Sequence, residues 1–289
     1  MHPILARNNV RVSGRGSRTL LFAHGFGCDQ NMWRFVAPAF EDEYRVVLFD
    51  YVGSGRSDAR AWDPQRYGSL EGYAQDVLDV CEALDLHDAT FVGHSVSGMI
   101  GILAAIREPA RFDDLILIGP SPRYLNDGPD YVGGFERADL EGLLEVMDKN
   151  YLGWASYLAP IVMQNAGRPE LTRELEESFC STDPKIARRF AEVTFFSDNR
   201  KDLANVTHPS LILQCSEDAI APSAVGDYLA RSIPGATLRR LRATGHCPHM
   251  SHPEETIEVM REYLAAAPSR REQAAASPSI RHRESWTRS

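Results

Sequence analysis

The chain has 289 residues, of which 43% are hydrophobic and 25% are charged, so a packed core is expected and a disordered or collagen-like chain is excluded. Its 31 basic and 40 acidic residues give a formal net charge of −9, and an acidic surface that repels phosphate backbones argues against a nucleic-acid partner. The sequence contains no apolar run of about 18 residues, so we expect no membrane-spanning helix.

Short apolar runs alternate along the chain with segments of helical periodicity. The predicted strands are Val10–Val12, Thr19–Ala23, Arg45–Phe49, Thr90–Val92, Leu115–Ile118, Ser210–Gln214 and Thr237–Leu241. Several contain uninterrupted apolar runs, such as LLFA and LILI, which is typical of strands covered on both faces in a parallel sheet. Leu70–Leu84 and Val96–Ile106 show helical spacing. The alternation predicts an α/β fold with a mostly parallel central sheet.

Between the fifth and sixth strands the pattern changes to helices alone. The predicted helices there are Ala138–Lys149, Tyr151–Gln164, Glu170–Phe179 and Pro184–Phe195. Because this block is too long for one ordinary crossover, we interpret residues 123–205 as a helical cap inserted into a core of residues 1–122 and 206–266. Helices that simply cover the sheet are the alternative.

The last segment, residues 267–289, differs from the rest of the chain. It holds five arginines and two glutamates and few residues that could form a core. This composition predicts a disordered basic tail, and a basic docking peptide is the alternative.

The strongest local motif is GHSVSG, residues 93–98, between a predicted strand and a predicted helix. It resembles the nucleophile elbow of the α/β-hydrolase family, G-x-S-x-G, with Ser95 as the nucleophile. Such a turn needs small residues two positions away from the nucleophile, which Gly93 satisfies, whereas Ser97 replaces the second glycine. A plain helix N-cap is the alternative role for Ser95.

A serine nucleophile needs a base and an orienting carboxylate. In this family the acid and then the histidine follow the serine along the chain. Asp218 follows the sixth strand and His246 follows the seventh. Both residues therefore lie at the C-terminal ends of strands, and ligands in open α/β sheets bind at that edge of the sheet. We favour these two over their neighbours, which are Glu217, His249 and His252.

The motif HGFG, residues 24–27, ends the second strand and resembles the oxyanion loop of the same family. Backbone N–H groups of Phe26 and Val96 would then point at the carbonyl oxygen as it gains charge. A plain tight turn is the alternative for this segment.

Longer segments narrow the resemblance. FAHGFGCDQNMW, FDYVGSGRSD, NDGPDYVGGF, ILQCSEDAIAP and GHCPHMSHP are similar to a sub-family that contains the bacterial stress-response regulator RsbQ and the plant karrikin and strigolactone receptors. The similarity spans about residues 3–266. It implies an α/β-hydrolase fold with a helical cap and a serine that works as a hydrolase nucleophile. It also implies a signalling role, with a PAS-domain phosphatase as partner in the RsbQ-like case.

The predicted activity is therefore hydrolysis of a small apolar ester or lactone through an acyl-enzyme, with no metal or organic cofactor. The alternatives are a cofactor-free haloperoxidase-like enzyme and a non-catalytic ligand-binding receptor. The predicted substrate pocket comprises His24, Gly25, Phe135, Trp154, Tyr157, Phe195 and Ala219. For the aromatic residues, a place in the core of the cap is the alternative.

Five cysteines occur in the chain, an odd number at wide spacings without a CxxC pair. The sequence therefore gives no support to a zinc or redox motif, and it predicts free thiols in a reducing cytoplasm. The first sixteen residues lack the apolar segment of a secretory signal, which agrees with that location.

Overall fold

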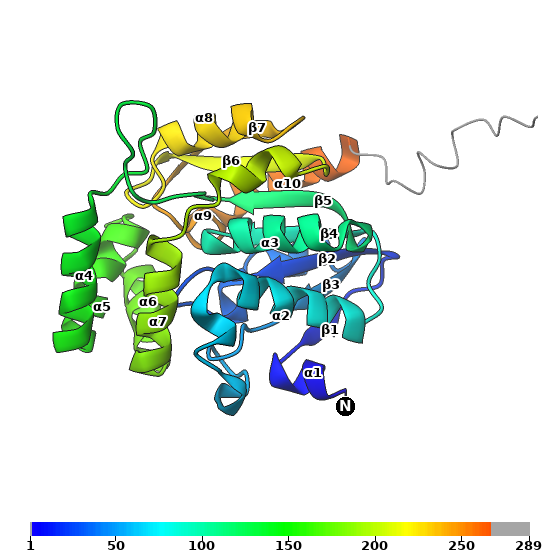
Figure 1. Cartoon of the computed structure of the whole chain (residues 1–289). Coiled ribbons are helices and arrows are strands. Elements are labelled where there is room, and N and C mark those ends of the chain that lie inside the picture. Colours follow the sequence, from blue (N-terminus) through cyan, green and yellow to red (C-terminus); the bar gives the residue numbers. More distant parts are fainter. Residues whose placement is uncertain (1, 267–289) are drawn as a thin grey trace, which may run out of the picture.

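The computed structural model describes residues 2–266, so the predicted basic tail lies outside the described residues. Residues 2–266 form a seven-stranded sheet in the order β1-β3-β2-β4-β5-β6-β7 (Figure 1). The strands are β1 (Arg11–Ser13), β2 (Arg18–Ala23), β3 (Tyr44–Leu48), β4 (Ala89–His94), β5 (Phe112–Ile118), β6 (Ser210–Glu217) and β7 (Thr237–Thr244). β1 pairs antiparallel with β3, and the other pairings are parallel. The predicted sheet is confirmed.

The central strands are covered on both faces, as their apolar sequences predict. Every residue of β4 and β5 is buried. Because side chains alternate along a strand, Leu20 packs into one hydrophobic cluster and its neighbour Leu21 into the other. The sheet therefore separates two apolar cores, and its ends carry the polar residues.

The described residues form α-helices that either cover the two faces of the sheet or lie beyond its end. They are α1 (Pro3–Arg7), α2 (Leu70–Ala83), α3 (Val96–Arg107), α4 (Arg137–Lys149), α5 (Tyr151–Met163), α6 (Pro169–Ser181), α7 (Pro184–Phe195), α8 (Ser223–Ser232), α9 (Pro248–Ser251) and α10 (Pro253–Ala266). Buried residues of α2, α3 and α8 join the cluster that contains Leu21, and those of α9 and α10 join the cluster that contains Leu20. Among residues 2–266, no helix is both long enough and apolar enough to cross a bilayer.

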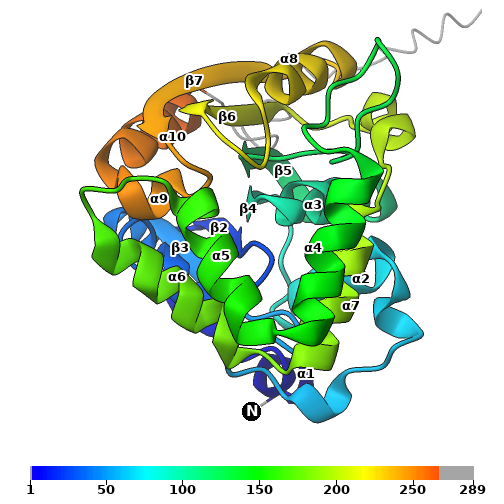
Figure 2. The same ribbon diagram turned by 90° about the vertical axis from the view of Figure 1, so that its left-hand side faces the viewer.

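Helices α4 to α7 lie together beyond one end of the sheet (Figures 1 and 2). They follow β5 and precede β6 in the chain, and their bounds agree with the predicted helices to within two residues. α4 packs against α5 and α7, and α5 packs against α6. We refer to residues 123–205 as the cap, a domain division that stays a prediction.

The sequence analysis missed four helices, namely α1, α8, α9 and α10. α1 and α9 have only five and four residues, too few for a periodic pattern. α10 was predictable, because Thr256, Met260 and Leu264 recur at four-residue spacing and are all buried.

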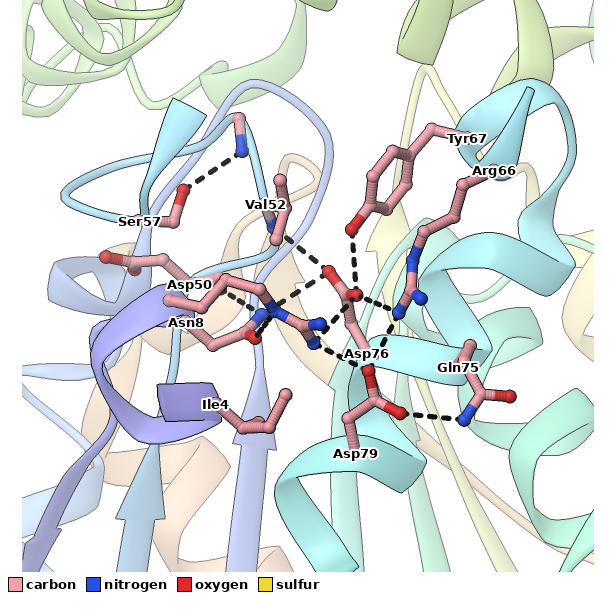
Figure 3. Close-up of polar contacts among 12 residues, drawn as sticks. Ile4, Asn8, Asp50, Val52, Ser57, Arg66, Tyr67, Gln75, Asp76 and Asp79 are labelled. Carbon is pink, nitrogen blue, oxygen red and sulfur yellow. Dashed lines mark hydrogen bonds and ion pairs between the residues drawn. The ribbon is translucent and has the colours of Figure 1, made fainter. Parts of the chain in front are cut away.

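A buried carboxylate ties the N-terminal segment to the rest of the core. Asp76 on α2 is fully buried, and Figure 3 shows polar groups converging on it from three segments of the chain. Its carboxylate accepts hydrogen bonds from Arg66 Nη2 at 2.8 Å, Tyr67 Oη at 2.9 Å, Val52 N at 3.1 Å, and Arg7 Nη2 and Asn8 Nδ2 at 3.3 Å each. Hydrogen bonds from this many donors offset the free-energy cost of burying the Asp76 charge.

We predict that Asp76→Ala destabilises the protein by about 3–5 kcal/mol, because it removes a fully buried carboxylate that accepts from five donors. Arg7 and Arg66 keep their contacts with Asp79, but the Val52, Asn8 and Tyr67 donors lose this buried acceptor. The measurement is the free energy of unfolding in urea. Asp42→Ala is the matched control, since the Asp42 side chain is 85% exposed in its pair with Arg15 and its loss should cost less than about 1 kcal/mol. Equal effects of the two substitutions would contradict the prediction.

Candidate active site

Ser95 occupies a strained turn between β4 and α3. Its φ of +57° and ψ of −123° lie outside the regions that a residue with a side chain ordinarily adopts, at a cost of about 1–3 kcal/mol. The packing around the turn explains why its neighbours are small. A Cβ atom added to Gly93 would lie 2.7 Å from the Ser97 carbonyl oxygen, and one added to Gly98 would lie 2.7 Å from the Pro120 side chain. The strand, the turn and the helix therefore hold Ser95 in place.

Three predicted residues meet at the carboxyl edge of the sheet. His246 Nε2 lies 2.8 Å from Ser95 Oγ, and His246 Nδ1 lies 2.7 Å from Asp218 Oδ2. The side chains come from the ends of β4, β6 and β7, and all three are buried. The His246 loop is held in turn by its backbone N–H, which donates to the Val162 carbonyl oxygen in the cap at 2.8 Å.

The environment of Asp218 stabilises its ionised form. Burial raises the pKa of this carboxyl, but the adjacent His246 imidazole and two backbone N–H donors lower it by more, so the pKa lies below its ordinary value. The donors are Ile220 N at 2.8 Å and Ala221 N at 3.0 Å, both to Oδ1. The neighbouring candidate, Glu217, is exposed at the end of β6, so the structure brings Asp218 and not Glu217 to His246.

The two other histidines of this segment do not contact Ser95. His249 is fully buried against Trp33, with ring centroids 4.6 Å apart. His252 Nδ1 lies 2.9 Å from Ser251 Oγ. Of these three histidines, His246 is the one that the fold places beside Ser95.

The predicted oxyanion loop packs directly against the elbow. A Cβ atom on Gly25 would lie 2.5 Å from His94 Nδ1 and 3.4 Å from Ser95 Cβ, so residue 25 must be glycine for the loop to approach. Val96 is the first residue of α3, where a backbone N–H has no partner within the helix. The two predicted donors, Phe26 N and Val96 N, therefore belong to segments in contact with Ser95.

The cavity at Ser95 is small and mostly apolar, with a volume of about 30 Å³. Its walls come from both the core and the cap and comprise Phe26, Cys28, His94, Ser95, Tyr124, Leu158, Val162, Leu175, Phe179, Thr194, Phe195, Ile220, His246 and Cys247. Three of these residues, Leu158, Phe195 and Ile220, also line an apolar groove of about 720 Å³ beside α4 and α5. The small cavity at Ser95 and the larger groove thus share part of their walls.

Comparison with known proteins agrees with this geometry. The family model described as "Alpha/beta hydrolase family" matches residues 20–259. The chain belongs to the α/β-hydrolase family. It is 40% identical over 264 residues to strigolactone esterase D14 of Arabidopsis thaliana, covering 91% of this chain and 98% of that protein.

The alignments with two further relatives span nearly all of this hydrolase. It is 38% identical over 258 residues to karrikin insensitive 2 receptor CA of Petunia hybrida, covering 89% of this chain and 95% of the receptor. The solved structure of a hydrolase from Oleispira antarctica superimposes with a TM-score of 0.90 and 48% identity, covering 92% of this chain and 97% of that one. These three proteins are thus named as an esterase, a receptor and a hydrolase.

The hydrolase places the predicted pocket residues in three different surroundings. Phe195 lines both the Ser95 cavity and the groove, and Phe135 and Tyr157 line the groove. Trp154 lies fully buried in the cap, packed edge-on against Phe26 with ring centroids 6.1 Å apart. The alternative of a core residue therefore holds for Trp154.

The remaining pocket predictions differ from the observed cavity wall. His24 is fully buried in contact with Tyr51, so its side chain faces away from the cavity. Gly25 contributes its close approach to the elbow and no side chain. Ala219 is exposed, and its neighbour Ile220 lines the cavity instead, because the turn that directs the Asp218 carboxylate inward also directs Ile220 inward.

Tyr124 is a residue that the sequence analysis missed. Its hydroxyl lies 3.5 Å from Ser95 Oγ, and the side chain is buried. Burial raises the pKa of Tyr124 above its ordinary value, so the hydroxyl stays protonated and can donate. The residue lies in the segment SPRYL after β5, which has no periodic pattern that would place it at the site.

A grouping of buried side chains with metal-ligating chemistry lies beside the triad. The ligand atoms of His94, Cys247 and His249 lie within 4.8 Å of one another. Burial raises the pKa of the Cys247 thiol well above its ordinary value, whereas a metal binds the thiolate. His94 Nε2 already donates to the His246 carbonyl oxygen at 2.7 Å. We therefore assign to His94 the role of holding the His246 loop, and no metal to the grouping.

The same burial keeps these histidines neutral. Burial lowers the pKa of His94 to about 3 and lowers that of His249 well below its ordinary value. The unfolded chain binds a proton at each near pH 6.5. Each of these histidines therefore lowers the free energy of unfolding as the pH falls below about 6.5 toward the folded-state pKa. At higher pH this loss is absent.

We predict that His249→Gln reduces this acid sensitivity. Between pH 7 and pH 5 the wild type should lose about 2 kcal/mol more stability than the variant, because glutamine takes up no proton. Urea unfolding at the two pH values measures the difference. His87→Gln, at an exposed position, is the matched control, and a His249→Gln variant as acid-sensitive as wild type would refute the prediction.

Proposed function

We propose that this protein is a serine hydrolase that cleaves small apolar esters or lactones through an acyl-enzyme on Ser95. The observation that carries the proposal is the continuous set of contacts from Asp218 through His246 to Ser95, at 2.7 and 2.8 Å. A serine hydroxyl becomes a useful nucleophile when a base lies within hydrogen-bond reach and a third group orients that base. The family membership and the esterase names of its relatives support the same reading.

In the proposed reaction, Ser95 Oγ attacks the substrate carbonyl carbon while His246 Nε2 takes the hydroxyl proton. The backbone N–H groups of Phe26 and Val96 stabilise the negative oxygen. When the bond to the leaving oxygen breaks, His246 returns the proton to it, which leaves the acyl group on Ser95. Water then attacks the ester carbon with His246 as base, releasing the acid and the free serine.

The electrostatics around His246 suit this sequence of proton transfers. Asp218 accepts from Nδ1, which fixes the tautomer that leaves Nε2 free to accept the serine proton. The lowered pKa of Asp218 keeps the carboxylate ionised, so it stabilises the imidazolium that forms. Tyr124 is placed to donate to Ser95 Oγ or to an oxygen bound beside it.

The cavity supports a restricted substrate class. About 30 Å³ at Ser95 accommodates only a small acyl group or the edge of a lactone ring without rearrangement. The apolar groove of about 720 Å³ beyond Leu158, Phe195 and Ile220 offers room for a larger apolar portion. We therefore favour substrates with a compact carbonyl end and an apolar remainder.

A sensing role is the second candidate. A relative that is 38% identical is named as a receptor, and the small, mostly apolar cavity at Ser95 could bind a compact ligand. An RsbQ-like stress regulator with a PAS-domain phosphatase partner is the specific form that we propose. Five free cysteines among the described residues support a reducing cytoplasm as the place of action.

We predict that Ser95→Ala abolishes hydrolysis of 4-nitrophenyl acetate, with kcat reduced by about 10⁴-fold or more, because the nucleophile is lost. Asp218→Asn should reduce kcat by about 10³–10⁴-fold with little change in KM. Mass spectrometry after treatment with phenylmethylsulfonyl fluoride should place one label on Ser95.

Ser232→Ala, a serine of α8 outside the cavity, is the matched control and should retain full activity and labelling. A wild type that neither turns over the ester nor takes the label would refute the hydrolase and leave the binding receptor. Peroxide-dependent halide oxidation without ester cleavage would favour the haloperoxidase-like enzyme.

A further inference from the structure

Ser97 departs from the glycine expected two residues after the nucleophile, and its hydroxyl is fully engaged. The side chain is completely buried. Its Oγ lies 2.5 Å from the His24 carbonyl oxygen and 2.8 Å from the Tyr51 hydroxyl. A glycine here would leave both of these buried polar groups without this partner, so the serine does more than fit the turn.

The donors in this contact follow from elementary chemistry. A carbonyl oxygen only accepts, so the Ser97 hydroxyl donates to His24 O. The Tyr51 hydroxyl must then donate to Ser97 Oγ. Burial raises the pKa of Tyr51, so its proton is retained. The result is a directed chain from Tyr51 through Ser97 to His24, in which each hydrogen bond polarises the next.

Tyr51 also holds the other side of His24. Its backbone N–H donates to His24 Nε2 at 3.2 Å, so Nδ1 carries the ring proton and donates to the Gly25 carbonyl oxygen at 2.8 Å. Residue 24 is therefore fixed at both its carbonyl group and its ring. The next residue is a glycine, which restrains the backbone least, and the one after it is Phe26, whose N–H is a proposed oxyanion donor.

The segment that carries Tyr51 is itself anchored. Val52 N donates to the Asp76 carboxylate, and Asn8 Nδ2 donates to the Asp50 carbonyl oxygen at 3.0 Å. Figure 3 shows Asp50 and Val52, the two chain neighbours of Tyr51, beside α2 and the N-terminal segment. Tyr51 is thus a fixed point from which a hydroxyl can position a loop.

We propose that Ser97 is a positioning residue for the oxyanion hole. Together with Tyr51 it fixes the loop 24–27 against the elbow, so that the Phe26 N–H lies where negative charge develops. This inference rests on the proposed function, because it concerns the same reaction. The hydroxyl touches neither substrate nor reacting atoms, and it acts through the loop.

Complete loss of one oxyanion donor in comparable enzymes lowers kcat by about 10²–10³-fold. A donor that is displaced but still present should lower kcat by a smaller factor than its complete loss does. For Ser97→Ala we expect kcat for 4-nitrophenyl acetate to fall about 10–100-fold, with KM within about threefold of wild type, since an interaction realised in the transition state is weakened.

A second readout separates this role from general loosening of the site. 1,1,1-Trifluoro-2-butanone adds to a serine nucleophile and places a negative oxygen in the oxyanion hole. Its inhibition constant should rise in Ser97→Ala by about the same factor as kcat falls. The affinity for butanol, which forms no oxyanion, should not change.

Ser210→Ala is the matched control. Ser210 is also buried, and its hydroxyl likewise donates to a backbone carbonyl, that of His208, at 3.0 Å. It begins β6, at the opposite end of the sheet from the triad. We expect Ser210→Ala to lower stability to a similar extent and to leave kcat within about twofold of wild type.

Tyr51→Phe keeps the Ser97 to His24 contact but removes the donor that polarises it, and it should lower kcat about 3–10-fold. This variant decides the question should Ser97→Ala fail to fold. Values of kcat and of the ketone inhibition constant within twofold of wild type in the folded variants would overturn the inference and leave the hydrolase standing. A wild type without hydrolysis or Ser95 labelling would overturn the proposed function, and this inference with it.

Discussion

The hydrogen bond between Ser95 Oγ and His246 Nε2 joins residues 151 positions apart in the chain. It forms because the sheet brings the ends of β4 and β7 to the same edge. Two strands, β5 and β6, lie between the strands that carry these residues, so sheet geometry sets the span. The loop after β6 fills it with Asp218, and Gly245 N donates to the Glu217 carbonyl oxygen at 2.9 Å, which ties the acid and base loops together. The strained turn at Ser95 persists because β4 before it and α3 after it are both buried in the core and hold its two ends.

The polarity of this buried region is organised around one carboxylate. His94 and His249 remain neutral because burial disfavours their charged forms. Asp218 keeps its charge because the His246 ring and two backbone donors outweigh its desolvation. The ionised carboxylate lies 2.7 Å from His246 Nδ1 and so orients the imidazole toward Ser95. Buried polar groups with shifted pKa values gather at functional sites, and this cluster surrounds the residues of the proposed active site.

How much of this was predictable depends on the range of the interaction. The strands and the four helices α4 to α7 follow from local patterns, because apolar periodicity and turn residues are visible within a few positions. The choice of Ser95, Asp218 and His246 rests on the resemblance of their segments to the α/β-hydrolase family. The pocket wall does not follow. Trp154 and Phe195 are both large and apolar with helical neighbours, and only the packing of the cap against the core sends one into its interior and the other to the cavity. Tyr124 lies in an irregular segment whose path is set by contacts distant in sequence.

The wall shared by the Ser95 cavity and the groove bears on both proposed functions, hydrolysis and sensing, because both would use the same site. Leu158 lies on α5 in the cap, Phe195 ends α7, and Ile220 lies in the acid loop. A ligand whose carbonyl reaches Ser95 while its apolar part occupies the groove must displace or press on these side chains. Under the proposed function we therefore expect a ligand in the site to contact the cap helices and, at Ile220, the loop that holds Asp218. The chain is similar both to a relative named as an esterase and to one named as a receptor, and under either proposed function the ligand would contact this same wall.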